Sequence, residues 1–167
     1  KGPMVMQGYY NNPEATAEVL EDGWLNTGDV GHQDARGYLY LTGRAKNIIV
    51  TEGGKNVFPE EIEDHFQLYN EIDTICVLGY LTDKKTKSEG IRALVYPDQK
   101  WADEMAKQYG DKAKQKIEER INQIIGEVNK ELQSYKKITR VTVVDEPLEM
   151  TSTKKVKRFV VAQKYKD

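Results

Sequence analysis

Residues 111–135, DKAKQKIEERINQIIGEVNKELQSY, carry the strongest structural signal in the sequence. Apolar side chains recur there every three or four residues, at Ile117, Ile121, Ile124, Val128, Leu132 and Tyr135. This spacing places them on one face of an α-helix. The stretch therefore predicts a long amphipathic helix, whose apolar face requires other elements to cover it.

Short β-prone runs lie on both sides of this helix. Residues 74–79 and 91–96 predict two strands separated by the polar loop 82–90, and residues 138–144 predict a third strand. Strands covered by amphipathic helices form an α+β sandwich. We therefore predict an α+β domain that contains a three-stranded sheet and flanking helices.

Further elements are predicted around this sheet. Residues 48–50 and 56–58 flank the glycine-containing segment 52–55, which predicts a small β-hairpin. Pro59 and the two acids after it then begin a helix, since proline and acids are favoured in the first helical turn. The tail from Arg158 to Tyr165 predicts a last helix.

Residues 1–45 differ in composition from the rest of the chain. Turn formers and short apolar runs dominate them, and the predicted elements are a helix from Pro13 to Leu20 and a strand at 38–41. This stretch is short of a core of its own. We expect residues 1–45 to be the edge of a larger body, and the start at Lys1, without an initiator methionine, to be an interior cut.

Composition limits the classes of function. The net charge of −2 gives no general attraction to nucleic acid or anionic lipid, and no run is long and apolar enough to span a membrane. The only cysteine, Cys76, lies in an apolar run, which predicts a buried thiol. A single cysteine excludes an internal disulfide and fits a reducing compartment. His32 and His65 are isolated, so no metal site is predicted. We expect a cytoplasmic protein without nucleic-acid partners; peripheral membrane association is the alternative.

Two polar clusters precede the predicted sheet. Asp29 follows Gly28 in a turn, where a carboxylate can accept hydrogen bonds from both hydroxyls of a ribose. Arg44 follows Gly43, and a guanidinium can fork onto phosphate or ribose oxygens. The glycine pair at 53–54 allows a backbone to approach a ligand closely. Ordinary solvated turns are the alternative interpretation of all three features.

A third cluster lies near the end of the chain, at residues 151–158, TSTKKVKR. Residues 150–167 hold six basic side chains and one acid in a chain that is net negative. A lysine on a hydroxyl-rich loop suits a developing phosphate charge. A basic solvated tail is the alternative.

In sequence order, these clusters resemble motifs of the adenylate-forming superfamily of acyl-CoA synthetases, luciferases and adenylation domains. Residues 4–16, MVMQGYYNNPEAT, and 24–29, WLNTGD, are similar to two of its segments. Residues 43–63, GRAKNIIVTEGGKNVFPEEIE, resemble the motif that crosses its interdomain hinge. Residues 151–158 resemble its terminal signature, T-x-[ST]-G-K-x-x-R, with Lys154 where many relatives have glycine.

The resemblance implies two parts of a larger enzyme. Residues 1–45 would be the C-terminal end of the large N-terminal AMP-binding domain, and residues 46–167 would be the small, mobile C-terminal lid domain. That N-terminal domain would be the main protein partner of the lid. The fragment alone is expected to be inactive.

The resemblance also implies roles for residues at the nucleotide. Asp29 would bind the ribose hydroxyls of ATP or AMP, and Arg44 would contact the ribose or phosphate side. Lys155 matches the lysine required for adenylation. Because Lys154 replaces the usual glycine, Lys154 is the alternative to Lys155; the spacing to Arg158 favours Lys155.

Three further residues are implied in the change between two half-reactions. Lys46 falls where the family has its hinge residue, and Gly53 and Gly54 match a loop that lines the pantetheine tunnel of coenzyme A. The implied function is that of a long-chain fatty-acid–CoA ligase using ATP, Mg²⁺ and coenzyme A, all bound mainly by the missing N-terminal domain. The alternatives are a non-catalytic interaction module, or an adenylating enzyme for another carboxylic acid or a carrier protein.

Overall fold

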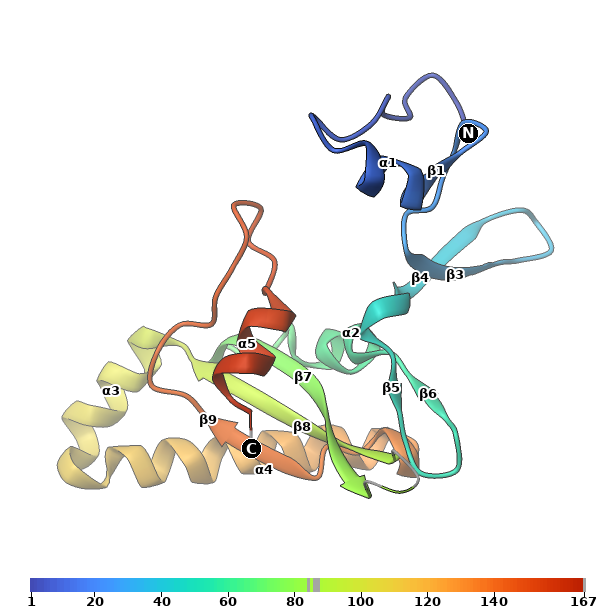
Figure 1. Cartoon of the computed structure of the whole chain (residues 1–167). Helices are drawn as coiled ribbons and strands as arrows, with labels where there is room; N and C mark the ends of the chain where they lie inside the picture. The colour runs from blue at the N-terminus through green and yellow to red at the C-terminus, as the bar shows by residue number, and fades with distance from the viewer. Residues whose placement is uncertain (84, 86–87, 167) are drawn as a thin grey trace. The chain divides into compact units, whose positions relative to one another are not determined.

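The computed structural model describes residues 1–83, 85 and 88–166, and divides into two compact units, Lys1–Lys46 and Asn47–Asp167. The larger unit is built on a three-stranded sheet of β7 (Ile72–Asp83), β8 (Ser88–Pro97) and β9 (Arg140–Val143), in the order β7-β8-β9 (Figure 1). β7 and β8 are antiparallel, whereas β9 runs parallel to β8. The parallel pair requires a crossover connection.

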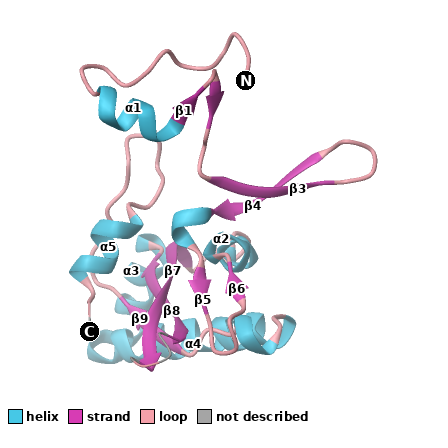
Figure 2. Cartoon of the chain, turned by 45° about the vertical axis from the view of Figure 1, so that its right-hand side comes forward, coloured by secondary structure: helices cyan, strands magenta, loops and turns pink. Residues whose placement is uncertain are grey.

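Two helices make this crossover, α3 (Gln99–Tyr109) and α4 (Ala113–Glu131). α4 runs along one face of the sheet, as both ribbon views show (Figures 1 and 2). Its residues Ile121, Ile124 and Val128 are at most 3% exposed and belong to the same apolar cluster as alternate residues of β8, namely Ile91, Ala93 and Val95. The periodic apolar face predicted from the sequence is therefore the face that forms the core.

The other face of the sheet is covered by α5 (Arg158–Lys164). Cys76, Leu94 and Val161 form a second buried cluster there with Leu78, Val144 and Leu148. Because apolar helices or loops cover both faces, the strands have nearly continuous apolar runs instead of alternating ones. Burying one such aliphatic side chain stabilises the fold by about 1.5–3 kcal/mol.

A hairpin and a short helix complete the larger unit. The hairpin pairs β5 (Ile49–Val50) with β6 (Asn56–Val57), and α2 (Pro59–Glu63) follows it. Ile49, Val57 and Ile62 are buried in the main apolar cluster. The hairpin and α2 are thus fixed to the sheet by apolar packing.

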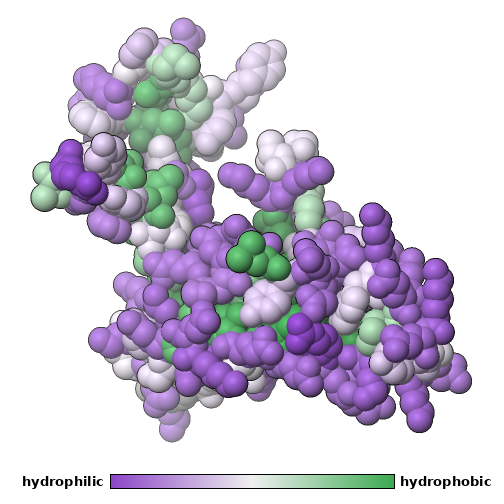
Figure 3. Space-filling model, turned by 180° about the vertical axis from the view of Figure 1, so that it is seen from behind, coloured by the Kyte–Doolittle hydropathy of each residue, from purple (hydrophilic) through white to green (hydrophobic). Residues whose placement is uncertain are grey.

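The smaller unit contains α1 (Pro13–Val19) and two antiparallel strand pairs, β1 (Leu20–Glu21) with β2 (Trp24–Leu25), and β3 (Asp29–Gln33) with β4 (Leu39–Arg44). Asn12 caps α1, since its side chain accepts a hydrogen bond from the Ala15 N–H at 3.0 Å. None of residues 1–46 is buried. Apolar side chains of this unit lie at its surface in Figure 3.

The α+β class, the three-stranded sheet, the hairpin and the flanking helices are confirmed, and several boundaries were predicted wrongly. The predicted helix 111–135 is α4, which ends at Glu131 because Leu132 turns extended, with φ −80° and ψ 145°. α3 was not predicted. The predicted loop 82–90 is partly strand, since β7 continues to Asp83 and β8 begins at Ser88; its residues 84, 86 and 87 lie outside the described residues. No helix of the described chain is long and apolar enough to cross a bilayer.

Candidate functional site

Asp29 and Arg44 lie opposite each other at one end of the β3–β4 ribbon. Arg44 Nη1 donates to Asp29 Oδ1 at 2.7 Å, and the two side chains are 54% and 30% exposed. Gly28, with φ +71°, closes the turn before Asp29, and its carbonyl accepts the Ala45 N–H at 2.9 Å. The structure therefore brings together the two residues predicted to bind nucleotide.

This exposed pair keeps hydrogen-bonding capacity for a ligand. A carboxylate has about four lone-pair sites, and a guanidinium has five N–H donors. The single bond between Asp29 and Arg44 leaves most of these groups directed to solvent. Mutual pairing also restricts both side chains before any ligand arrives, which lowers the entropic cost of binding.

Lys46 lies in a short 3-10 helix, Ala45–Asn47, at the division between the two units. Its side chain is exposed. The next residue, Asn47, donates through its side-chain amide to Glu60 on α2. The chain is thus anchored to the larger unit directly after Lys46.

Gly53 and Gly54 form the turn between β5 and β6. Their φ angles are +81° and +73°, a region that favours glycine, and a Cβ at either position would meet no atom within 4 Å. The Gly54 N–H donates to the Thr51 carbonyl at 3.0 Å, which closes the turn. The turn therefore presents bare backbone to open space.

Gly53 also lines a hollow of about 520 Å³ in the larger unit. Most side chains around the hollow are polar: six carry hydroxyl groups, Lys137 is basic, and Glu52 and Glu89 are acidic. The Tyr80 ring is fixed, because Arg140 lies 3.9 Å above its centroid and its hydroxyl is 3.0 Å from Thr139 Oγ1. Polar groups around an open groove are suited to a hydrophilic ligand.

Lys155 lies on a hairpin formed by residues 149–157, which we call the Lys155 hairpin. The Lys157 N–H donates to the Glu149 carbonyl at 2.8 Å, and the Thr151 N–H donates to the Lys155 carbonyl at 2.7 Å. Thr151 Oγ1 accepts the Lys155 N–H at 3.1 Å. These bonds fix the backbone that carries Lys155, while its side chain is exposed.

Lys154 adopts a left-handed conformation in this turn, with φ +58°. Its N–H donates to the Thr151 carbonyl at 3.0 Å. A side chain with a Cβ adopts this conformation at a cost of roughly 1–2 kcal/mol, whereas glycine adopts it readily. The turn therefore has the geometry that glycine favours at position 154.

The basic tail is only partly free of ion pairs. Lys157 lies 3.9 Å from Glu149, Lys164 lies 2.6 Å from Glu146, and Arg158 pairs with Glu63. Lys154 and Lys155 form no ion pair with any residue that the structure describes. The free positive charge of the hairpin is therefore concentrated at its tip. Sequence reasoning missed Glu63, which has no local signal linking it to Arg158.

Cys76 is fully buried, and burial raises the pKa of its thiol to about 12. The thiolate is the reactive form of cysteine, so this side chain is inert at neutral pH. Thiol catalysis by Cys76 is therefore excluded.

In the parts of the chain that the structure describes, no three histidine, cysteine or acidic side chains gather where they could hold a metal ion.

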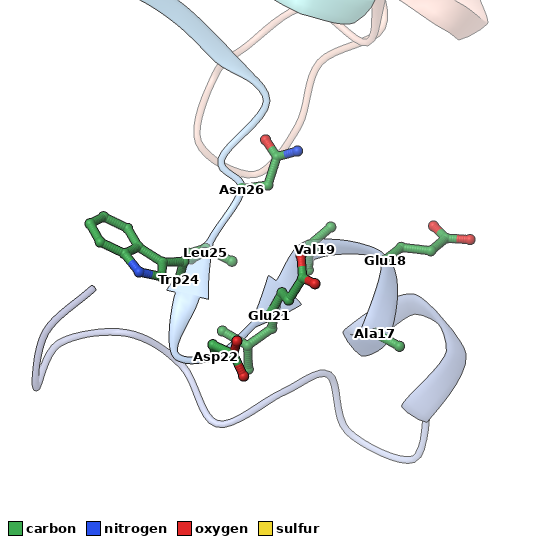
Figure 4. A pocket seen from close by; sticks show the side chains of 9 residues that line it. Ala17, Glu18, Val19, Glu21, Asp22, Trp24, Leu25 and Asn26 are labelled. Carbon is green, nitrogen blue, oxygen red and sulfur yellow. The ribbon is translucent and has the colours of Figure 1, made fainter.

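A second hollow, of about 430 Å³, lies in the smaller unit and is lined by residues 17–22 and 24–26. Figure 4 shows Glu18, Glu21 and Asp22 around it, with Trp24 on the side away from Glu18. Three carboxylates repel the phosphates of a nucleotide. None of the predicted site residues lines this hollow.

The chain is similar in sequence and structure to parts of several CoA ligases and synthetases. It is 44% identical to a long-chain-fatty-acid–CoA ligase of Bacillus subtilis over 57% of this chain and 16% of that protein. It is 43% identical to an indoleacetate–CoA ligase of Aromatoleum aromaticum over 58% of this chain and 18% of that protein. The solved structure of o-succinylbenzoate CoA synthetase from B. subtilis with its acyl-adenylate intermediate matches with a TM-score of 0.73 and 26% identity, covering 100% of this chain and 29% of that one.

These relatives are several times longer than the chain, which spans less than a third of each. The family model described as AMP-binding enzyme C-terminal domain matches residues 46–167. That range holds Lys46, the glycine turn and the Lys155 hairpin. The chain therefore belongs to the AMP-binding enzyme C-terminal domain family.

Proposed function

We propose that this chain is the C-terminal part of an AMP-forming acyl-CoA ligase that acts on long-chain fatty acids. The observation that carries the proposal is the unpaired amine of Lys155 on an exposed, hydrogen-bonded hairpin. Membership of the family supports the reaction class. Residues 1–45 are proposed to be the end of the large N-terminal domain that binds the substrates.

In the first half-reaction, a carboxylate oxygen of the acid attacks the α-phosphorus of ATP, and pyrophosphate leaves. Negative charge builds up where the two anions meet, and a positioned lysine lowers this barrier. At about 4 Å and an effective dielectric constant near 20, one such contact is worth roughly 4 kcal/mol before desolvation. This energy corresponds to a rate factor of roughly a hundred to a thousand.

The Asp29–Arg44 pair is proposed to bind the nucleotide. The ribose hydroxyls would donate to the lone pairs of Asp29 that Arg44 leaves open, and the remaining donors of Arg44 would reach ribose or phosphate oxygens. The reaction class uses Mg²⁺ with ATP, but the described residues of this chain offer no cluster of ligands for it. We therefore assign Mg²⁺ binding to the N-terminal domain.

In the second half-reaction, the thiol of coenzyme A attacks the acyl carbonyl, and AMP leaves. The bare backbone of Gly53 and Gly54, beside a polar hollow, supports their proposed place along the pantetheine arm. A different surface of the lid must then face the acyl-adenylate. A rotation about Lys46, at the division between the two units, would supply it.

The long-chain substrate is proposed from the similarity to the B. subtilis ligase and from the sequence GGKNVFPEEIE at residues 53–63. Another relative acts on an aromatic acid, as its name states. The test is to assay thioester formation by the intact protein with fatty acids of different length and with indoleacetate. A preference for the aromatic acid would overturn this part of the proposal. The buried Cys76 thiol is consistent with a reducing, cytoplasmic location.

The proposed reaction is tested by measuring acyl-adenylate formation and thioester formation separately in the intact protein. Lys155→Ala should lower acyl-adenylate formation about a hundred-fold or more, and should leave thioester formation from supplied acyl-adenylate within about twofold. Lys154→Ala is the matched control, because it removes the neighbouring charge from the same turn. A larger loss in Lys154→Ala than in Lys155→Ala would assign the role to Lys154. Equal loss of both halves would contradict the assignment.

A further inference from the structure

The Lys155 hairpin needs an anchor, because its own hydrogen bonds fix its shape but not its position on the sheet. Arg158 follows the hairpin as the first residue of α5. Its side chain points into the larger unit and is only 17% exposed. A charged group withdrawn from water in this way must be compensated, so its partners identify the anchor.

Glu63, at the end of α2, is the main partner of Arg158. Arg158 Nη1 donates to Glu63 Oε1 at 2.7 Å, and Nη2 donates to Glu63 Oε2. The Glu63 side chain is 19% exposed. A bidentate pair of this kind fixes both the distance and the plane of the two groups.

The pair also binds the edge of the sheet. β7 is an edge strand, and at Val77 the N–H donates to Glu63 Oε1 at 2.7 Å while the carbonyl accepts Arg158 Nη1 at 2.9 Å. Glu63 and Arg158 therefore occupy the position that another strand would take beside Val77. Breaking the pair would expose these backbone groups along with the two charges.

A second carboxylate extends this cluster toward the proposed hinge. Glu60 Oε1 lies 3.6 Å from Arg158 Nη2 and accepts the side-chain amide of Asn47, the residue after Lys46. Glu60 Oε2 is buried and has no hydrogen-bond partner among the residues that the structure describes. Two carboxylates thus share one guanidinium, and the cluster links the base of the Lys155 hairpin to the chain beside Lys46.

The charge state of the pair follows from its surroundings. Burial raises the pKa of Glu63 above its ordinary value, against the opposing effects of Arg158 and the Val77 N–H. Burial also acts to lower the pKa of Arg158, but its acidic neighbours, Glu63 foremost and Glu60 to a smaller extent, raise this pKa overall. The guanidinium therefore stays charged and depends on Glu63 for compensation.

We propose that Glu63 is a positioning residue for Lys155: its bidentate pair with Arg158 fixes the base of the Lys155 hairpin to the edge of the sheet. Glu63 touches no reacting atom in this assignment and acts through Arg158. The inference rests on the proposed role of Lys155 in adenylation. Its structural half, the anchoring of the hairpin, can be tested without any activity.

Tryptic cleavage after Lys154 and Lys155 measures the anchoring. Glu63→Gln, made in the intact protein, should be cut at these two bonds at least about fivefold faster than the wild type, followed by mass spectrometry of the products. Glu61→Gln is the matched control, because Glu61 lies on the same helix and loses its own ion pair, to Lys136 at 2.7 Å, without reaching Arg158. Equal cleavage rates in the wild type and Glu63→Gln would overturn the anchoring.

Assays of the two half-reactions test whether Glu63 positions Lys155. Glu63→Gln should lower kcat for acyl-adenylate formation about ten- to a hundred-fold with KM for ATP within about twofold, and should leave the thioester step within about twofold. If the single variant does not fold, Glu63→Gln with Arg158→Gln serves in its place, because it removes both charges of the bidentate pair and leaves only the partly exposed Glu60 carboxylate without Arg158. Where both fold, the double variant should lose no more activity than the single one, since Glu63 acts through Arg158.

Failure of the proposed function can be distinguished from failure of the positioning role of Glu63. A wild-type protein that forms no acyl-adenylate contradicts the proposed function, whatever the cleavage rates are. An active wild type whose folded Glu63 variants keep adenylation within twofold, or lose both half-reactions equally, contradicts the positioning role alone.

Discussion

Lys154 shows how one residue can bear a backbone cost within a hairpin. Its φ of +58° lies in the left-handed region, and its N–H still closes the turn onto the Thr151 carbonyl. The two threonine hydroxyls of the turn, at positions 151 and 153, lie 2.9 Å apart and brace the same bend. The turn is therefore dictated by hydrogen bonds that override the preference of Lys154.

Replacing Lys154 with glycine should relieve this cost. We expect Lys154→Gly to raise the free energy of unfolding by up to about 1 kcal/mol, because relief of the left-handed conformation outweighs the greater entropy of glycine in the unfolded chain. Lys154→Ala is the control, since it removes the same charge but keeps the Cβ, and it should give no gain. Urea denaturation followed by circular dichroism measures both, and equal stabilities of the two variants would contradict the strained turn.

Among the elements, α4 and β7 are joined by polar as well as apolar contacts. Arg120 on α4 donates to Glu71, just before β7, from Nε at 2.9 Å and from Nη2 at 2.7 Å. The Glu71 side chain is 21% exposed. This pair fixes the register of the helix along the strand, which apolar packing alone leaves less specific.

The Glu71–Arg120 pair should make stability depend on pH. Burial acts to raise the pKa of Glu71, but the hydrogen bonds and charge of Arg120, together with a backbone hydrogen bond at Glu71, hold this pKa below its ordinary value of 4.5. Because the folded state binds the proton more weakly than the unfolded state, the stabilisation is complete above pH 4.5 and is lost as the pH falls through the lowered pKa.

The measurement is the difference in urea midpoint between the wild type and Glu71→Gln. This difference should be largest near pH 7 and should shrink steadily as the pH falls below the ordinary carboxyl range. Glu104→Gln, an exposed position on α3, should show no such trend. A gap between the wild type and Glu71→Gln that does not change with pH would show that the pair contributes through packing alone.

Elements whose apolar residues recur at a regular spacing were predictable from the sequence, and elements defined by distant contacts were not. The stripe of α4 was found because its buried residues, such as Ile121 and Val128, repeat at helical spacing. α3 was missed because its large apolar residues are few, namely Trp101, Met105 and Tyr109, and none of its residues is fully buried. The strand ends near residue 83 depend on pairing across the sheet, which a polar local sequence does not reveal.

The same distinction, between local patterns and distant contacts, separates the residues of the candidate site that were predicted from those that were not. Asp29 and Arg44 were both singled out, and the β3–β4 register brings them together. Glu63 was not, because it meets Arg158 across 95 positions of sequence, and no local pattern encodes such a contact. Sequence reasoning thus found the residues that belong to local motifs and missed the residue that anchors one of them.

At the scale of the whole chain, the two units differ in what stabilises them. All of the buried apolar residues lie in the larger unit, whereas the smaller one exposes successive side chains of β4, among them Leu39 and Leu41, each 69% exposed. A two-stranded ribbon with apolar side chains on both faces is not independently stable in water. This is consistent with the proposal that residues 1–45 are completed by a larger body.

The two tryptophans report on the two units separately. Trp24 is 65% exposed in the smaller unit, while Trp101 packs against the core of the larger one. In the chain of 167 residues, a Trp24→Phe variant should show a cooperative urea transition in Trp101 fluorescence. The Trp101→Phe variant should show the emission of an exposed indole at every urea concentration. Coincident cooperative transitions in both variants would show that the two units unfold together, and would contradict the inference that only the larger unit is stably folded in this chain.

Under the proposed function, residues 46–167 serve both half-reactions of the intact protein and must move between them. Lys46→Pro should slow the overall formation of acyl-CoA and leave acyl-adenylate formation within about twofold, because proline fixes φ near −65° and restricts the residue before it. Lys46→Ala is the control, since it removes the charge and keeps the backbone free to rotate. Single-turnover experiments that follow acyl-adenylate and then acyl-CoA separate the two steps. An unchanged thioester rate in Lys46→Pro would show that the rotation occurs elsewhere, and an equal effect of both variants would point to the Lys46 charge instead of its backbone.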